Sequence, residues 1–243
     1  MKKKTKIILA ISIPVGVIAL TISAFFIYVS VGQYKAGDKA ITALNSKEVE
    51  ITQNNDYIFF NGSGSKDALI LYPGAKVESK AYSPLALSIA KSGTDVFILE
   101  CPFNIALFSQ DKYKDVIKDY HYDNYYLGGH SLGGCVSSLV IEDNNKIKGL
   151  FFIAAYPDKN ISNYNLKTLL MYGSNDGVID LYTYNSNKKY LPNDYQEVII
   201  GGGNHSQFGD YGLQSNDHEA SISMEEQIKV TTETWMKFLA DGD

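Results

Sequence analysis

Short apolar runs alternate with helix-like runs along most of this chain, and this alternation constrains the fold more than any other feature. The runs typical of buried strands cover residues 68–72, 96–99, 124–128, 149–153, 168–172 and 197–200. Helical patterns lie between or after them, at residues 82–91, 112–120, 134–141, 180–190 and 224–239. Strands that alternate with helices predict a mostly parallel central sheet with helices on both faces. We therefore expect an α/β fold.

A hairpin and a helix cap are predicted at the two ends of this region. Residues 49–52 and 57–60 read as the strands of a hairpin, with a polar turn between them. At the other end, Ser223 is expected to cap the helix at 224–239, with Glu226 as its capping-box partner.

The N-terminal residues differ from the rest of the chain. Lysines at positions 2, 3, 4 and 6 precede an uncharged apolar stretch, residues 7–31. A bilayer is spanned by roughly 20 apolar residues, whereas a cleaved signal peptide has a shorter apolar region and a small-x-small cleavage site, for which no convincing pattern is present. We expect a signal anchor that holds the body on the extracytoplasmic side of the cell membrane, because the lysines favour a cytoplasmic N-terminus. Secretion after cleavage is the alternative.

The domain organisation follows from these features. The 243 residues allow one substantial domain. We expect a transmembrane helix over 1–32, a stalk over 33–48 and the α/β domain over 49–243. A net charge of -5 and the lack of a basic stripe argue against a nucleic-acid partner. Two cysteines, Cys101 and Cys135, make no disulfide framework, and we expect no bridge between them.

A Gly-His-Ser-Leu-Gly sequence at residues 129–133 lies between a predicted strand and a predicted helix. Gly-x-Ser-x-Gly is a weak pattern by itself, because glycine and serine are common residues. Its place at a strand-to-helix junction strengthens it, because such a sharp turn holds a serine in a strained conformation with its hydroxyl exposed. We therefore predict Ser131 as a nucleophile. Cys135 is the weaker candidate, because no base for it is apparent nearby in the sequence.

A serine nucleophile needs a base, and the base needs an acid that orients it. Functional groups gather at the carboxyl ends of the strands in an open α/β sheet. His205 follows the strand at 197–200 through a glycine-rich loop, and Asp176 follows the strand at 168–172. We predict His205 as the base and Asp176 as the acid.

Other candidates fit less well. Asp180 suits the start of the next helix better than it suits the site. The side chain of His130 should point away from the serine hydroxyl and shape the turn. His121 and His218 are expected in loops or at the surface.

Acyl transfer also needs donors for the developing oxyanion. The backbone N–H of Leu132 comes with the turn at Ser131. The second donor should come from the loop after the strand at 68–72, where Pro73 has no N–H. Gly74 or Ala75 must then supply it, and we favour Ala75. A plain Pro-Gly turn is the alternative reading of this loop.

From about residue 67 to 240, the chain resembles the α/β-hydrolase superfamily, and most of all its small bacterial, dienelactone-hydrolase-like "family 5" members. The motifs that carry the resemblance lie at residues 71–74, 129–134, 173–177 and 203–212. The resemblance implies a serine hydrolase with the triad Ser131, Asp176 and His205, and without a cofactor or metal. Two motifs depart from the pattern: Tyr-Pro-Gly at 72–74 replaces His-Gly, and Asn-Asp-His at 216–218 replaces Gly-Asp-Gly.

We therefore expect a carboxylesterase-like enzyme that cleaves a small-molecule or lipid-like ester through an acyl-enzyme intermediate. Residues 154–168 are too few for a lid domain, so the site should be open. Two alternatives stay open. One is an acyltransferase or peptidase that acts on envelope components, and the other is a membrane-tethered binding protein without catalysis.

Overall fold

The computed structural model describes residues 3–142 and 146–241, and its contacts divide the chain into two compact units, Met1–Gln33 and Tyr34–Asp243. The first unit contains helix α1 (Lys3–Ser30).

The prediction of a transmembrane helix is wrong. Among the described residues, none of the helices combines the length and the apolar character that a membrane span needs. Helix α1 includes the polar side chains of Thr21 and Ser23. The side chains of the predicted lysine cluster at positions 2, 3, 4 and 6 lie outside the described residues.

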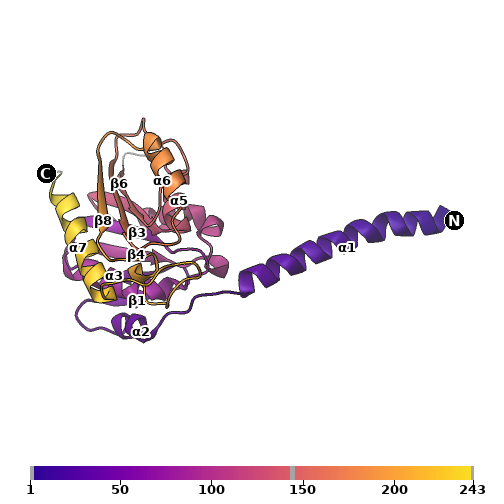
Figure 1. Ribbon diagram of the computed structural model, residues 1–243, viewed down its shortest axis with the longest axis horizontal. Coiled ribbons are helices and arrows are strands. Elements are labelled where there is room, and N and C mark those ends of the chain that lie inside the picture. Colours follow the sequence, from indigo (N-terminus) through magenta and orange to yellow (C-terminus); the bar gives the residue numbers. More distant parts are fainter. Residues whose placement is uncertain (1–2, 143–145, 242–243) are drawn as a thin grey trace. The chain divides into compact units, whose positions relative to one another are not determined.

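The second unit is built on one sheet that helices flank (Figure 1). The strand order in the sheet is β1-β2-β4-β3-β5-β6-β7-β8. The strands are β1 (Ile51–Gln53), β2 (Tyr57–Phe60), β3 (Asp67–Tyr72), β4 (Asp95–Leu99), β5 (Asn124–His130), β6 (Ile147–Ile153), β7 (Lys167–Gly173) and β8 (Tyr195–Ile200). Strands β1 and β2 are antiparallel to their neighbours, and all other pairs are parallel. This confirms the mostly parallel sheet.

Helices cover both faces of the sheet. They are α2 (Asp38–Leu44), α3 (Ser83–Lys91), α4 (Tyr113–Asp119), α5 (Leu132–Leu139), α6 (Leu181–Asn187) and α7 (Met224–Ala240). Leu85 of α3 and Trp235 of α7 belong to one buried apolar cluster, whereas Val116 of α4, Val136 of α5 and Tyr184 of α6 belong to a second. The two clusters lie on opposite faces, because successive strand residues such as Leu69 and Ile70 of β3 contribute to them alternately.

Residues just after Gln33 belong to the second unit. Tyr34 forms a parallel bridge with Val77, and its backbone N–H donates to the carbonyl of Lys76 at 2.7 Å. Helix α2 then packs against α3, and the backbone N–H of Ala40 in α2 donates to the Asp210 carboxylate at 2.8 Å.

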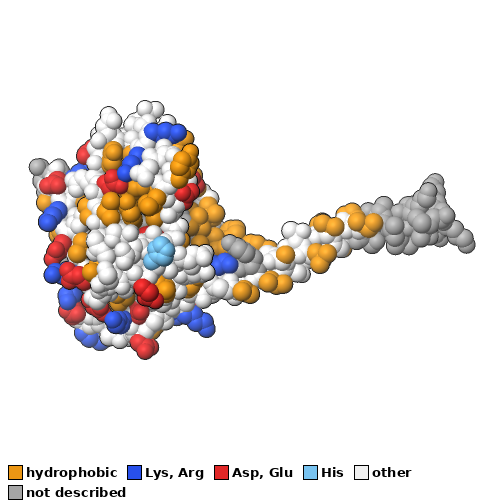
Figure 2. Space-filling model, viewed as in Figure 1, with side chains coloured by type: hydrophobic (Ala, Val, Ile, Leu, Met, Phe, Trp, Pro, Cys, Tyr) orange, Lys and Arg blue, Asp and Glu red, His pale blue; other side chains and the backbone are white. Residues whose placement is uncertain are grey.

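The surface of this unit is mixed in charge. Figure 2 shows a face on which acidic and basic side chains are interspersed among apolar ones. Both cysteines are free: Cys101 is buried and Cys135 is half-buried.

Between β6 and β7, residues 154–166 form turns and contain no helix. The expected absence of a lid domain at this point is confirmed.

Candidate active site

The three predicted site residues follow three strands of the sheet at the same edge. Ser131 follows β5, Asp176 lies three residues after the end of β7, and His205 lies in the loop after β8. Because β5, β6, β7 and β8 are parallel neighbours, their carboxyl ends meet at one edge of the sheet. The structure therefore brings together residues that are up to 74 positions apart in the sequence (205 minus 131).

Ser131 lies on a strained turn between β5 and α5. Its backbone has φ 53° and ψ -124°, a conformation that non-glycine residues rarely adopt. The backbone N–H of Ser131 donates to the carbonyl of Ile153 at 2.9 Å, which ties the turn to β6.

The glycines on either side of Ser131 permit this turn. A Cβ on Gly129 would lie 2.2 Å from the carbonyl carbon of Gly133, and a Cβ on Gly133 would lie 2.3 Å from the carbonyl oxygen of Tyr72. Both contacts involve backbone atoms that cannot move aside. The Gly-x-Ser-x-Gly sequence is therefore required by the close approach of α5 to β3 and β5.

His205 and Asp176 form a buried pair. The imidazole Nδ1 of His205 lies 2.8 Å from Oδ2 of Asp176, and the two side chains are 1% and 0% exposed. The other carboxylate oxygen of Asp176 accepts hydrogen bonds from the backbone N–H groups of Val178 and Ile179, both at 2.8 Å. These bonds hold the carboxylate toward the imidazole.

This pairing sets the proton position on His205. An ionised carboxylate only accepts hydrogen bonds, so Nδ1 of His205 carries the proton and Nε2 is left with its lone pair. Nε2 is buried and has no hydrogen-bond partner among the described residues. A buried nitrogen without a hydrogen-bond partner destabilises the folded state, and such groups are found where they have a role in catalysis.

Ser131 and His205 line the same cavity of about 310 Å³. Its other lining residues are Leu132, Cys135, Ala154, Ala155, Tyr156, Asp158, Val178, Ile179 and Asp180. Burial raises the pKa of the Cys135 thiol to about 11, which makes it a poor nucleophile near neutral pH. The geometry thus favours Ser131 over Cys135 as the nucleophile in this cavity.

Asp180 occupies the place that the sequence predicted for it. It is the N-cap of α6, and its carboxylate accepts hydrogen bonds from the backbone N–H groups of Tyr182 at 3.0 Å and Thr183 at 3.2 Å. The bonds from Thr183 and Tyr182 lower the pKa of Asp180 from its ordinary value. Asp180 is therefore a charged cap at the rim of the cavity and does not contact His205 as Asp176 does.

The predicted oxyanion donors are the backbone N–H groups of Leu132 and of Gly74 or Ala75. Leu132 begins α5, where the first N–H groups of a helix have no partner within the helix. In the loop after β3, the N–H of Gly74 already donates to the hydroxyl of Tyr82 at 3.0 Å. This bond leaves Ala75 as the better candidate of the two residues that the sequence pointed to.

His130 links three parts of the site through a chain of buried hydrogen bonds. Its Nε2 lies 3.0 Å from the backbone carbonyl of His205, and its Nδ1 lies 2.9 Å from the hydroxyl of Tyr82. The carbonyl can only accept, so Nε2–H donates to it and the Tyr82 hydroxyl donates to Nδ1. Burial and the nearby His205 hold the pKa of His130 well below its ordinary value, so the imidazole is neutral. The sequence predicted that His130 shapes the turn, but it gave no sign of Tyr82.

Asp217 is a second site residue that the sequence did not predict. Its buried carboxylate accepts hydrogen bonds from the backbone N–H groups of Gly177 at 3.0 Å, His205 at 3.3 Å and Ser206 at 2.8 Å, and from the Ser206 hydroxyl at 2.6 Å. Asp217 thus joins the loop that carries Asp176 to the loop that carries His205. Its neighbour Asn216, at φ 69°, fills a left-handed position that suits glycine or asparagine.

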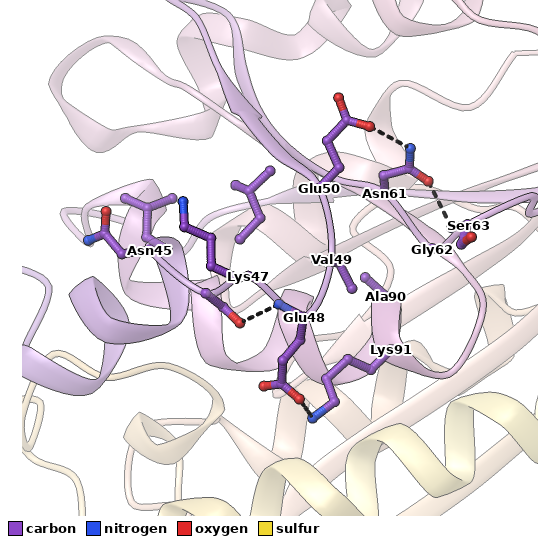
Figure 3. A pocket seen from close by; sticks show the side chains of 13 residues that line it. Asn45, Lys47, Glu48, Val49, Glu50, Asn61, Gly62, Ser63, Ala90 and Lys91 are labelled. Atoms are coloured by element: carbon purple, nitrogen blue, oxygen red, sulfur yellow. Dashed lines mark hydrogen bonds and ion pairs between the residues drawn. The ribbon is translucent and has the colours of Figure 1, made fainter.

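A larger cavity, of about 900 Å³, lies at the opposite end of the sheet, where β4 begins. Figure 3 shows that Glu48 pairs with Lys91 and that Glu50 accepts a hydrogen bond from Asn61 at 3.3 Å. It contains no nucleophile with a neighbouring base. The chemistry of the described residues is therefore concentrated in the smaller cavity at Ser131.

Comparison with known proteins points in the same direction. A model of the alpha/beta hydrolase family matches residues 68–229, about two thirds of the chain. No curated protein matches the chain in sequence.

Solved structures share the fold at low sequence identity. The carboxylesterase CesB from Bacillus subtilis is 12% identical, with a TM-score of 0.58 over 85% of this chain and 96% of that one. A dienelactone hydrolase from Anabaena variabilis is 12% identical, with a TM-score of 0.53 over 78% and 96%. Est1E from Butyrivibrio proteoclasticus is 13% identical, with a TM-score of 0.54 over 79% and 99%.

Proposed function

This chain belongs to the alpha/beta hydrolase family, and we propose that it hydrolyses a carboxylic ester through an acyl-enzyme formed on Ser131. The observation that carries the proposal is the state of His205. Its Nδ1 is held by Asp176 at 2.8 Å, its Nε2 has no hydrogen-bond partner among the described residues, and His205 lines the same cavity as Ser131. An imidazole in this state has a free lone pair on Nε2 and can accept the hydroxyl proton of a serine, which is what a serine nucleophile requires.

In the first half of the proposed reaction, Nε2 of His205 takes the hydroxyl proton of Ser131 as Oγ attacks the ester carbonyl. The negative charge that forms on the carbonyl oxygen is stabilised by the backbone N–H groups of Leu132 and Ala75. Asp176 stabilises the imidazolium, because its carboxylate accepts the Nδ1 hydrogen bond. The proton on Nε2 then passes to the leaving alcohol as the C–O bond breaks, and the acyl group stays on Ser131.

In the second half, a water molecule replaces the alcohol. Nε2 takes a proton from the water as its oxygen attacks the acyl carbonyl, and the same two N–H groups hold the oxyanion. The proton returns to Oγ of Ser131 as the acid leaves. An ester is the favoured substrate because a carboxylesterase is among the proteins with the same fold. The cavity of about 310 Å³ favours a small reacting group.

Hydrolysis of short p-nitrophenyl esters by the purified chain tests this function. We expect turnover that Ser131→Ala reduces to the rate of the uncatalysed reaction, and that His205→Gln reduces by about 10³-fold or more, because the serine loses its base. Ser162→Ala is the matched control, because Ser162 lies in the connection between β6 and β7 and does not line the cavity.

Unchanged turnover in Ser131→Ala would contradict the assignment. Equal losses in Ser131→Ala and Ser162→Ala would also count against it, because they would point to a general loss of folded protein.

A further inference from the structure

The cavity at Ser131 is negatively charged apart from its catalytic imidazole. Asp158 and Asp180 line it, and no lysine or arginine does. We propose that the substrate is a small ester with a cationic, ammonium-type group, and that Asp158 and the ring of Tyr156 bind this group. This inference rests on the proposed ester hydrolysis and names the class of ester.

Asp158 is the less compensated of the two carboxylates. The charge of Asp180 is offset by its hydrogen bonds to Tyr182 and Thr183 at the start of α6. The carboxylate of Asp158 makes no hydrogen bond or ion pair with the described residues, whereas its backbone N–H is fixed by the Ser138 hydroxyl at 2.9 Å. Asp158 therefore presents a free negative charge on a fixed stretch of backbone.

The nearest lysine in the sequence does not neutralise Asp158. Lys159 Nζ donates to the backbone carbonyl of Ile141 at 2.5 Å and lies 5.6 Å from the ring centre of Tyr164. Neither partner of Lys159 lines the cavity. Asp158 is exposed, so its carboxylate is open to a cation from solution.

Tyr156 adds a second feature that suits an ammonium group. It lies two residues before Asp158, and both side chains line the same cavity. An aromatic ring attracts a cation over its face, and quaternary ammonium groups bind in this way because they cannot donate strong hydrogen bonds. A carboxylate beside an aromatic ring therefore favours a cation over a neutral or anionic group.

The unpartnered Nε2 of His205 supports a ligand in this cavity. The His205 side chain is 1% exposed, its Nε2 has no hydrogen-bond partner among the described residues, and His205 lines the cavity together with Asp158. Ser131 and Asp158 both line a cavity of only about 310 Å³, so an ester whose carbonyl lies at Ser131 has its other end among the same lining residues. The apolar side chains of Ala154, Val178 and Ile179 leave room for the methylene groups between them.

Three esters of equal length test the preference. They are p-nitrophenyl 4-(trimethylammonio)butanoate, its neutral isostere p-nitrophenyl 5,5-dimethylhexanoate, and the anionic mono-p-nitrophenyl glutarate. We expect kcat/KM to be highest for the cationic ester and lowest for the anionic ester, with a difference of about fivefold between each ester and the next. This difference should become smaller at high salt, because salt screens a charge pair near the surface.

Asp158→Asn should reduce the cation-to-neutral ratio to about one, because it removes the charge and keeps the shape. Asp180→Asn should reduce the ratio less, since asparagine is also a good N-cap and the charge of Asp180 is already compensated. Asp194→Asn is the matched control. Asp194 is exposed and directly precedes β8, at the opposite edge of the sheet from the cavity, so the ratio should not change.

Binding to Ser131→Ala makes the test independent of turnover. Calorimetry with the primary amides of the same three acids should show the tightest binding for the cation, and Asp158→Asn should abolish the difference. Equal binding of the three amides, or a ratio that Asp158→Asn does not change, would overturn the inference. Failure of the proposed function would show differently, as a lack of Ser131-dependent hydrolysis of all three esters.

Discussion

At the scale of single residues, the site depends on buried polar groups whose partners fix where each proton lies. The N–H of Gly74 donates to Tyr82, the hydroxyl of Tyr82 donates to His130, and His130 donates to the backbone of His205. This chain connects the loop of the proposed oxyanion donor Ala75 to the turn at Ser131 and to the base. None of its members contacts the substrate in the proposed reaction, so they act by positioning.

Tyr82→Phe tests this positioning. The change leaves the N–H of Gly74 and Nδ1 of His130 buried without a partner, and each such group costs about 1–3 kcal/mol. We expect the free energy of unfolding to fall by about 2–5 kcal/mol. We also expect kcat of the folded enzyme to fall by about tenfold, with a smaller change in KM, because the oxyanion loop loses its anchor.

Tyr113→Phe is the control for this variant. Tyr113 is buried, and its hydroxyl donates to the carbonyl of Val140 at 3.3 Å, away from the cavity. Urea unfolding and ester kinetics should show a stability loss without a fall in kcat. A similar kcat in the two variants would argue against a positioning role for Tyr82.

The sequence predicted Ser131, Asp176 and His205 because each follows a strand in the order that one type of triad requires. Tyr82 and Asp217 carry no such sign. Tyr82 directly precedes α3, and Asp217 lies in the loop that departs from the Gly-Asp-Gly pattern of the family. Both reach the site only through tertiary contacts. Residues that position others through long-range hydrogen bonds cannot be found from local sequence, because their partners are far away along the chain.

At the scale of elements, the last helix holds one face of the sheet. Trp235 of α7 is fully buried, stacks on Phe151 of β6 with ring centres 5.3 Å apart, and donates from Nε1 to the hydroxyl of Thr94 at 3.1 Å. Ser223 caps α7, as predicted, by accepting a hydrogen bond from the N–H of Glu226 at 3.2 Å. The helix is thus fixed at its start and along its buried face.

Trp235→Ala should lower the free energy of unfolding by about 3–5 kcal/mol, because it leaves a large cavity between α7 and the sheet. Glu233→Ala on the exposed side of the same helix should change it by no more than about 0.5 kcal/mol. Chemical denaturation of both variants measures the two values. A loss below about 1 kcal/mol for Trp235→Ala would mean that α7 contributes little to the fold.

Strands and helices were predictable where burial shaped their composition. All five residues of β4 are buried, and such a strand reads as a continuous apolar run. The short edge strand β1 begins at Ile51, two residues after the predicted start, because an exposed edge strand carries little pattern. The placement of β3 between β4 and β5 was not predictable, since local sequence does not encode strand order.

At the scale of the whole molecule, the neutral state of His130 links the site to the stability of the fold. Burial and the nearby His205 lower the pKa of His130 in the folded protein, while an unfolded histidine has a pKa of about 6.5. Below that pH the unfolded chain binds a proton that the folded protein does not. The free energy of unfolding therefore rises with pH below about pH 6.5, and the protein becomes less stable as the pH falls through this range.

Urea unfolding between pH 7.5 and pH 5 should show this dependence, with a contribution from His130 of up to about 1.4 kcal/mol per pH unit below about pH 6.5. In His130→Gln the free energy of unfolding should depend less steeply on pH. In His218→Gln the pH dependence should equal that of the unchanged protein, because His218 is exposed. If the dependence is the same in His130→Gln as in the unchanged protein, then His130 is not the group responsible.

The fold class was predictable from the alternation of strands and helices, and the family from four short motifs. The predicted transmembrane helix, which rested on hydropathy and charge alone, was wrong for the described residues. Every residue of the proposed mechanism belongs to the second unit, Tyr34–Asp243.

The most direct test of the proposed mechanism is the site of covalent labelling by a fluorophosphonate, which reacts with an activated serine. We expect mass spectrometry to locate the phosphonyl group on Ser131 alone, with labelling that is absent in Ser131→Ala and at least about 10³-fold slower in His205→Gln. A label on another residue such as Cys135, or ester hydrolysis that continues while Ser131 stays unlabelled, would contradict the proposal that Ser131 is the nucleophile.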